Sequence, residues 1–201
     1  MQKKIIYLDR DGVINEDFGY VYKSDNFRFV NGVFEACKTF LNLGYEIVIV
    51  TNQSGIGRKY YSKNDFLKLT NWMLEEFKKN GINILNTYFC PHSPEDNCDC
   101  RKPNIGMIEQ SLNDFNIDLK NSWLIGDKIS DIETAIITIL PFCTVLAKIF
   151  WDNCKNMNYI LTVKNFNSLS ATTDLVSDST SGNELLDVTT PIVNVLGEEN
   201  D

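Results

Sequence analysis

Residues 5–12 read Ile5-Ile6-Tyr7-Leu8-Asp9-Arg10-Asp11-Gly12, a short apolar run followed at once by two aspartates. Four consecutive apolar residues bounded by polar ones are typical of a buried strand in a parallel sheet. Three further runs of this kind occupy residues 47–50, 87–89 and 123–125. Stretches with helical period separate the four runs. This alternation predicts an α/β fold, a Rossmann-like parallel sheet with helices on both faces.

Four segments between and after these strands carry apolar residues at helical spacing. The first ends before Gly44, and the second begins at Ser62 and ends at Gly81, which are typical helix-ending and helix-capping residues. The apolar positions of the four helices are Val33, Phe34, Cys37, Phe40 and Leu41; Phe66, Leu69, Met73 and Phe77; Ile108, Leu112 and Phe115; and Ile132, Ala135, Ile136 and Ile139.

Polar residues follow each predicted strand directly. Open parallel sheets bind ligands beyond the carboxyl ends of their strands, so these segments are expected to meet in one crevice. They read Asp9-Arg10-Asp11-Gly12, Thr51-Asn52-Gln53-Ser54-Gly55, Cys90-Pro91-His92 and Gly126-Asp127-Lys128.

Asp9 and Asp11 lie two positions apart, a spacing that can direct both side chains into that crevice. Phosphoryl transfer needs an anionic nucleophile, a proton donor for the leaving oxygen and a cation that lets two anions approach. Asp9 suits the nucleophile and Asp11 the acid/base. An isolated Asp-x-Asp more often caps turns. Here the supporting groups at the same sheet edge favour catalysis.

A third carboxylate, Asp127, follows the last strand and offers a hard oxygen ligand for Mg²⁺ alongside Asp9. Asp131 either binds such an ion through water or caps the next helix, and both interpretations stay open. The candidate phosphate contacts are a hydroxyl, two amides and two cations. The alternative for the hydroxyl and the amides is a plain turn before a helix, and the alternative for the two cations is that they are ordinary surface lysines. The candidates are Thr51, Asn52, Gln53, Lys102 and Lys128.

Four soft or borderline metal ligands gather in one short loop, Cys90, His92, Cys98 and Cys100. A Cys₃His set favours tetrahedral Zn²⁺, and a site whose four positions are all filled by protein is structural. The loop runs into Arg101-Lys102-Pro103, so zinc would hold two cations against the crevice. The other three cysteines show no such grouping and are expected to pack; they are Cys37, Cys143 and Cys154.

The negative charge of the chain is concentrated near its end. Residues 1–164 hold all 19 basic and 20 of the 27 acidic residues, a net charge of −1, so the remainder carries −7. A near-neutral body disfavours nucleic-acid binding. The apolar run before Asp9 is too short for a signal peptide, which predicts a cytoplasmic protein with reduced cysteines. The apolar stretch 134–151, interrupted by Pro141 and Lys148, is no clean membrane span.

This organisation predicts one phosphatase domain over residues 1–164 and an acidic, Ser/Thr-rich, flexible tail over 165–201. A last edge strand is expected at Tyr159–Val163, and Leu185-Leu186 and Ile192 to Leu196 could still dock. The absence of an evident repeat or cap favours a monomer.

These motifs, in this order, resemble the haloacid dehalogenase superfamily of phosphatases, in the subfamily with a zinc loop and no large cap domain. The similarity runs from about Ile5 to Ala135. It implies an aspartyl-phosphate intermediate on Asp9, Asp11 as acid/base, and Thr51 and Lys102 on the phosphate. It also implies Mg²⁺ on Asp9, the backbone carbonyl of Asp11 and Asp127, substrate choice by Arg101, and Asn52 and Arg58 close to the substrate. The motifs are Leu-Asp-Arg-Asp-Gly-Val-Ile-Asn, Val-Thr-Asn-Gln-Ser-Gly-Ile, Cys-Pro-His, Cys-Asp-Cys-Arg-Lys-Pro and Ile-Gly-Asp-Lys.

Two substrates are open within that subfamily. The segments 19–21, 25–27 and 54–56 resemble enzymes that remove the 7-phosphate of D-glycero-D-manno-heptose 1,7-bisphosphate in ADP- or GDP-heptose precursor synthesis, for lipopolysaccharide or capsule. The length of the loop from His92 to Cys98 instead resembles histidinol-phosphate phosphatases. We expect the heptose, because its segments adjoin the first two motifs. A non-catalytic phosphosugar-binding protein is disfavoured because every expected catalytic residue is present. Residues 136–142 lack the glycine-bearing turn usual in this superfamily.

Overall fold

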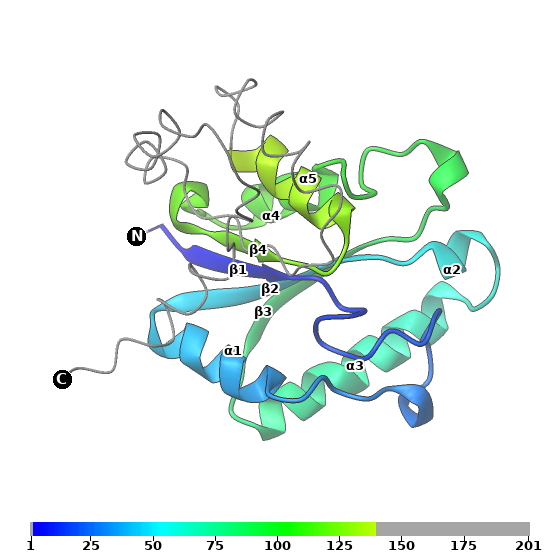
Figure 1. Ribbon diagram of the computed structural model, residues 1–201, viewed down its shortest axis with the longest axis horizontal. Coiled ribbons are helices and arrows are strands. Elements are labelled where there is room, and N and C mark those ends of the chain that lie inside the picture. Colours follow the sequence, from blue (N-terminus) through cyan, green and yellow to red (C-terminus); the bar gives the residue numbers. More distant parts are fainter. Residues whose placement is uncertain (1, 140–201) are drawn as a thin grey trace, which may run out of the picture. The chain divides into compact units, whose positions relative to one another are not determined.

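The computed structural model describes residues 2–139, which form a four-stranded parallel sheet with helices on both faces (Figure 1). The strands are β1 (Lys4–Leu8), β2 (Tyr45–Asn52), β3 (Ile84–Cys90) and β4 (Trp123–Ile125), in the order β3-β2-β1-β4. All three strand pairs are parallel. The predicted fold class and all four strands are confirmed.

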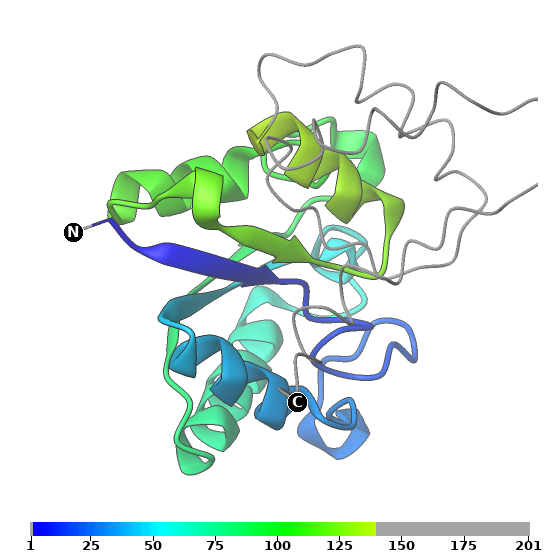
Figure 2. The ribbon, with the colours of Figure 1, turned by 60° about the vertical axis from the view of Figure 1, so that its left-hand side comes forward.

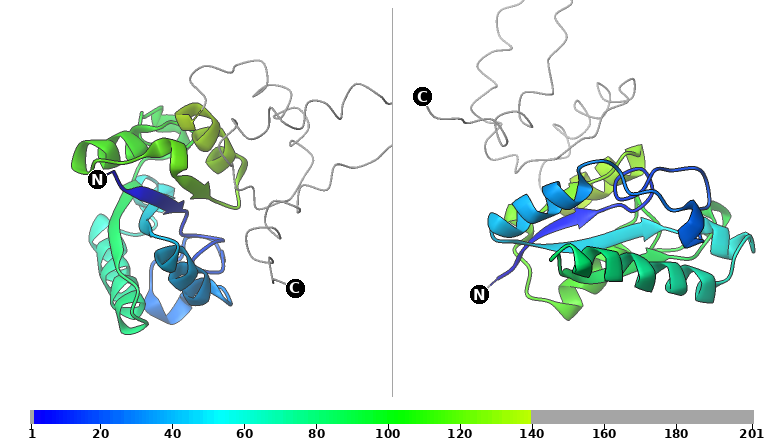
Figure 3. Two further views of the ribbon diagram at one scale, coloured as in Figure 1. Left: turned by 90° about the vertical axis from the view of Figure 1, so that its left-hand side faces the viewer. Right: turned by 90° about the horizontal axis from the view of Figure 1, so that it is seen from below.

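Five α-helices surround the sheet: α1 (Val33–Asn42), α2 (Ser54–Gly57), α3 (Lys63–Lys79), α4 (Gly106–Asp114) and α5 (Ile129–Ile139). Helices α1 and α3 cover one face, and α4 and α5 cover the other (Figures 2 and 3). Short 3-10 helices occupy Ser24–Asn26, Pro94–Asp96 and Leu119–Asn121. Within residues 2–139 no separate domain is inserted, in agreement with the expected lack of a large cap.

Helix α3 forms as its sequence predicts. Ser62 Oγ accepts a hydrogen bond from the backbone N–H of Asp65 at 3.1 Å, and the Asp65 carboxylate accepts one from the N–H of Ser62 at 3.0 Å. This capping box satisfies two backbone donors that a helix start leaves free. The predicted apolar face is buried against the sheet: Phe66, Leu69, Met73 and Phe77.

Helix α4 differs from its prediction. Leu112 is 38% exposed, although the apolar period placed it with Ile108. The buried face instead includes Ser111, whose hydroxyl donates to the Ile108 carbonyl at 2.6 Å and lies 2.7 Å from the Tyr7 hydroxyl. A serine with both partners can be buried at little cost, so hydropathy alone misplaces this face.

Strand register brings the loops together. Leu8 pairs with Ile49 on one side and with Ile125 on the other, so β1 and β4 end side by side. The N–H of Asp9 then donates to the Ile125 carbonyl at 2.9 Å, and the N–H of Gln53 donates to the Cys90 carbonyl at 2.7 Å. The carboxyl ends of all four strands therefore share one edge, as predicted.

Several predictions fall on residues 140–201, outside the described residues. They concern the rest of the 134–151 segment, the strand Tyr159–Val163, the tail 165–201 and the packing of Cys143 and Cys154. Cys37 is described, and it is buried in the core as expected. In the described part of the chain, no helix combines the length and apolar character needed to cross a membrane.

Candidate active site

Three carboxylates meet at the carboxyl edge of the sheet. Asp9 follows β1, Asp127 follows β4 and Asp131 lies in the first turn of α5, and one oxygen of each lies within 4.8 Å of the others. Gly12, with φ +93°, leaves room for Asp127, because a Cβ there would overlap the carboxylate. Hard oxygen donors so arranged fit Mg²⁺, which binds a few carboxylates and keeps several waters.

The environment of this cluster raises the pKa of Asp127. Partial burial raises its pKa, and the negative charge of Asp9 acts in the same direction, against the opposing charge of Lys128. A divalent cation at this point would offset the repulsion between the carboxylates. Asp131 also caps α5, because its Oδ2 accepts from the N–H of Lys128 at 3.1 Å.

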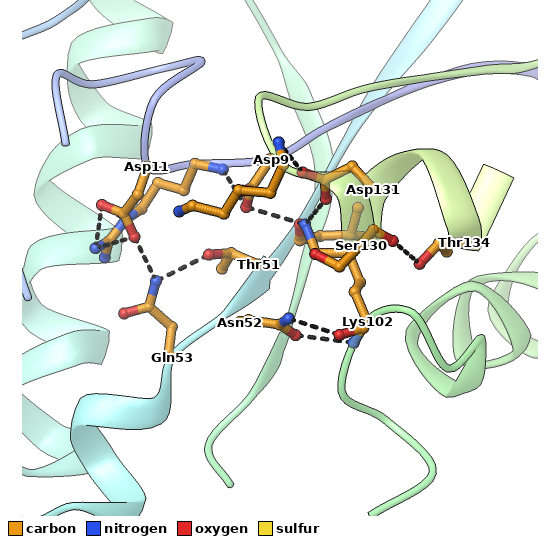
Figure 4. A network of polar contacts seen from close by, with 12 residues as sticks. Asp9, Asp11, Thr51, Asn52, Gln53, Lys102, Ser130, Asp131 and Thr134 are labelled. Atoms are coloured by element: carbon orange, nitrogen blue, oxygen red, sulfur yellow. Dashed lines mark hydrogen bonds and ion pairs between the residues drawn. The ribbon is translucent and has the colours of Figure 1, made fainter. Parts of the chain in front are cut away.

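Lys102 occupies the centre of the site (Figure 4). Its Nζ lies 3.1 Å from Asp9 Oδ1 and 2.5 Å from Asp131 Oδ1, and it donates to the Val50 carbonyl at 2.8 Å. Burial alone would lower the pKa of Lys102, but the two carboxylates outweigh burial and raise it. The ammonium group therefore stays charged throughout the neutral range.

Asn52 fixes the backbone of Lys102. Its Nδ2 donates to the Lys102 carbonyl at 3.1 Å, and its Oδ1 accepts from the Lys102 N–H at 3.0 Å. Both ends of the amide are thus engaged, so Asn52 joins the end of β2 to the segment that carries the central cation.

Replacing Lys102 with methionine is expected to lower the free energy of unfolding by about 3–5 kcal/mol, because it leaves buried carboxylates without their cation. The raised pKa means that this stabilisation is complete below the unfolded-state pKa, about 10.4, and is lost only as the pH rises through the folded value. Urea unfolding at pH 7 measures the change.

The matched control is Lys128→Met. The side chain of Lys128 is 49% exposed, and its Nζ lies 3.1 Å from Asp17 Oδ2. This is a solvent-exposed ion pair. Its loss is expected to cost less than about 1 kcal/mol. Equal losses of unfolding free energy in the two variants would show that Lys102 does not stabilise the buried carboxylates more than an exposed lysine does.

The two oxygens of Asp9 differ. Oδ1 accepts from the backbone N–H of Arg10 at 2.8 Å and faces Lys102. No group in residues 2–139 donates a hydrogen bond to Oδ2. The carboxylate is therefore oriented by one oxygen, with the other available for attack on an electrophile.

Asp11 lies apart from the three-carboxylate cluster and points towards Gln53 (Figure 4). The Arg10 guanidinium contacts both of its oxygens, at 2.7 and 2.8 Å. Asn15 Nδ2 donates to Oδ1 at 3.1 Å, and Gln53 Nε2 donates to Oδ2 at 3.0 Å. Gln53 Nε2 also donates to Thr51 Oγ1 at 2.8 Å. Thr51 thus connects the surroundings of Asp11 to the end of β2.

The amides of Asn52 and Gln53 are engaged within the site, and three predicted cationic contacts pair with groups other than the two aspartates. Lys128 contacts Asp17, as described above. Arg58 Nη2 lies 3.2 Å from Glu95 Oε1, and Arg101 Nη1 donates to the His92 carbonyl at 3.4 Å. The structure therefore gathers Thr51, Gln53, Asn52 and Lys102 around the two aspartates and ties both arginines to the cysteine-containing loop.

The four cysteine and histidine ligands form a second cluster. Cys90 Sγ lies 3.4 Å from Cys98 Sγ and 3.6 Å from His92 Nδ1, and Cys100 Sγ lies 3.2 Å from His92 Nδ1 and 3.5 Å from Cys98 Sγ. Tetrahedral zinc with bonds of about 2.0–2.3 Å requires ligand separations of roughly 3.5–3.8 Å. The donor set fits zinc, and the observed separations of 3.2–3.6 Å lie within a few tenths of an ångström of that range. Burial raises the pKa of the Cys90 thiol, and a bound metal would act in the opposite direction.

Two residues of the site were not singled out by sequence reasoning. Arg10 is 1% exposed and pairs with Asp11, and Tyr61 donates its hydroxyl to Gln53. Arg10 carries one signal, its place between the two aspartates. Tyr61 carries none, because it meets Gln53 through the packing of its ring against Gly55 in α2.

Comparison with known proteins identifies the family. The profile of the polynucleotide kinase 3 phosphatase family matches residues 4–165. The chain belongs to this family of haloacid dehalogenase-like phosphatases. The match includes every candidate site residue and reaches beyond the similarity expected from the motifs alone.

Curated relatives and a crystal structure agree with this assignment. The D-glycero-alpha-D-manno-heptose-1,7-bisphosphate 7-phosphatase of Campylobacter jejuni is 48% identical over 136 residues, 68% of this chain and 78% of that protein. The D-glycero-beta-D-manno-heptose-1,7-bisphosphate 7-phosphatase of Yersinia pestis is 44% identical over 138 residues, 65% and 73%. The structure of D,D-heptose 1,7-bisphosphate phosphatase from B. bronchiseptica, complexed with magnesium and phosphate, has a TM-score of 0.62 at 31% identity and covers 67% of this chain and 75% of that one.

Proposed function

We propose that this phosphatase removes the 7-phosphate of D-glycero-D-manno-heptose 1,7-bisphosphate. The observation that carries the proposal is the 48% identity, over 78% of its length, to a relative named for this reaction. The geometry supports it, because a buried carboxylate with one available oxygen lies beside a fixed ammonium group, as phosphoryl transfer requires. Relatives named for both anomers support the sugar over histidinol phosphate.

The proposed reaction has two steps, transfer of the phosphoryl group to Asp9 and hydrolysis of the aspartyl phosphate. Asp9 Oδ2 attacks phosphorus and forms an O–P bond while the bond to the C7 oxygen breaks, and Asp11 gives that oxygen a proton. Water then attacks the phosphorus of the aspartyl phosphate, Asp11 takes the proton of that water, and phosphate leaves with Asp9 restored. Lys102 and the Thr51 hydroxyl stabilise the phosphoryl oxygens.

Two metals complete the proposal. Asp9, Asp127 and the backbone carbonyl of Asp11 would hold Mg²⁺, with Asp131 close by, and the ion would neutralise charge on the transferring phosphoryl group. Cys90, His92, Cys98 and Cys100 would hold Zn²⁺ as a structural ion. The ion would fix the loop that leads directly to Arg101 and Lys102, and through it the substrate contacts of Arg101 and Arg58.

The domain bounds, location in the cell and oligomeric state are proposed from the sequence. We assign phosphatase activity to residues 1–164 and treat 165–201 as an acidic tail. The protein is proposed to act as a cytoplasmic monomer on a small sugar phosphate. A net charge of −1 over residues 1–164 supports a small substrate over a nucleic acid.

Turnover of competing substrates tests the function. We expect kcat/KM for heptose 1,7-bisphosphate to exceed that for histidinol phosphate and for a 3′-phosphorylated oligonucleotide by at least about 100-fold, because a site built for one polar substrate rejects others strongly. Phosphorus NMR is expected to show loss of the 7-phosphate with the 1-phosphate kept. Both anomers are compared. A preference for histidinol phosphate or the oligonucleotide would overturn the substrate assignment.

A further inference from the structure

A buried polar chain runs from Tyr61 to the proposed acid/base. The Tyr61 hydroxyl donates to Gln53 Oε1 at 2.6 Å, and Gln53 Nε2 donates to Asp11 Oδ2 at 3.0 Å and to Thr51 Oγ1 at 2.8 Å (Figure 4 shows the Gln53 end). Gln53 is 2% exposed and Tyr61 is 6% exposed. One amide thus uses its oxygen and both hydrogens inside the protein.

Chemistry fixes the direction of every bond in this chain. Burial raises the pKa of Tyr61 to about 12, so its hydroxyl keeps its proton at neutral pH and can donate. The amide oxygen of Gln53 accepts the hydrogen bond from this hydroxyl. This orientation of the amide directs Nε2 towards the Asp11 carboxylate. The reverse orientation would place Oε1 against carboxylate oxygens. Thr51 accepts from Nε2, so its own hydroxyl hydrogen is left for a phosphate oxygen.

Packing fixes the Tyr61 ring in turn. A Cβ at Gly55 would overlap the ring, so the ring lies in space that only a glycine leaves open. The Tyr22 ring stacks on Tyr61 with a centroid distance of 5.1 Å and an interplanar angle of 10°. Helix α2, which contains Gly55, and the loop after β1 therefore both set the position of the hydroxyl.

We propose that Tyr61 and Gln53 are positioning residues that hold Asp11 in the place from which it exchanges protons with the leaving oxygen. The proposal rests on the acid/base role proposed for Asp11. Removing the Tyr61 hydroxyl leaves Gln53 Oε1 buried without a donor, and a buried acceptor without a partner is unfavourable. The amide then turns or moves towards another donor and no longer holds Asp11.

The dependence on the leaving group tests this role. Because kcat/KM reports all steps up to departure of the leaving group, Tyr61→Phe is expected to lower it about 10- to 100-fold for the heptose bisphosphate, whose alkoxide must be protonated. For p-nitrophenyl phosphate, whose leaving phenolate needs no proton, the fall is expected to stay below about threefold. Gln53→Met is expected to show the same difference between substrates.

Tyr88→Phe is the matched control. The Tyr88 hydroxyl donates to Asp114 Oδ2 at the same distance, 2.6 Å, between β3 and α4. Its loss removes an equivalent hydrogen bond, so thermal unfolding of this variant and of Tyr61→Phe can be compared, and the ratio of the two substrates should stay at the wild-type value. Equal falls on both substrates in Tyr61→Phe, or no fall on either, would overturn the proposal.

Wild-type activity separates this proposal from the proposed function. If the wild type hydrolyses another alkyl phosphate and leaves the heptose bisphosphate intact, the substrate assignment fails. The comparison is then made with that alkyl phosphate, and the role of Tyr61 and Gln53 stands or falls on the same ratio.

Discussion

Replacing Asp9 with asparagine is expected to lower kcat for phosphate release by about four orders of magnitude or more, the scale seen when an enzyme loses its nucleophile. The amide keeps the shape of the side chain but cannot form the acyl-phosphate bond. Lys102 keeps its ion pair with Asp131, at 2.5 Å, so the fold is expected to persist. Phosphate release is measured alongside circular dichroism and zinc content.

Glu35→Gln is the control for this change. Glu35 is an exposed carboxylate in the first turn of α1, so its neutralisation should leave turnover within about twofold of wild type, as for most surface changes. Comparable turnover by the Asp9→Asn variant and the wild type would exclude Asp9 as nucleophile. Retained sugar binding without turnover in the wild type would instead favour the non-catalytic alternative.

Removal of the proposed zinc ion is expected to lower both stability and activity. Stripping the ion with a strong chelator, or replacing Cys98 with serine, is expected to lower Tm by roughly 10–20 °C, which corresponds to about 5 kcal/mol for a chain of this size. Activity should fall about tenfold or more, because a 1 Å displacement of a positioning segment can cost about 100-fold. Magnesium alone should not restore it, whereas zinc followed by magnesium should.

The expected fall in activity follows from the position of the loop that contains the four cysteine and histidine ligands. Lys102 follows two residues after Cys100, and the N–H of Gly57 in α2 donates to the Pro91 carbonyl at 2.8 Å. Loss of the proposed ion would therefore act on both the central cation and the segment after Thr51. Cys37→Ala, in the core, is the control, since it should lower Tm while zinc stays bound. Purified protein without zinc, or full activity after its removal, would contradict this role.

Much of the fold follows from the sequence because two patterns agree. Strands β1 and β2 have apolar runs that are almost fully buried, and polar residues follow the apolar run of each of the four strands, so strand positions and the shared carboxyl edge follow together. The position of the α4 face does not follow. Ser111 is buried because Tyr7, from a strand more than 100 residues earlier, contacts its hydroxyl at 2.7 Å, and hydropathy carries no record of such a partner.

The site shows the same limit. Residue types and order indicate Asp9, Lys102 and the cysteine loop, because their chemistry is unusual at those positions. Asp131 could either cap a helix or join the metal site on sequence grounds, and the structure shows it capping α5 and facing the carboxylate cluster at once. The contact of Tyr61 with Gln53 depends on how α2 packs, which residue types alone do not specify.

Transfer of the phosphate from the substrate to Asp9 can be tested by trapping the aspartyl phosphate. Enzyme turning over heptose 1,7-bisphosphate with magnesium is quenched in acid within one turnover and digested for mass spectrometry. We expect phosphate on Asp9, in the peptide that contains residues 5–12, and none in Asp9→Asn. Free phosphate formed during the same interval with no adduct on Asp9, or with the adduct on another residue, would exclude Asp9 as the phosphate acceptor.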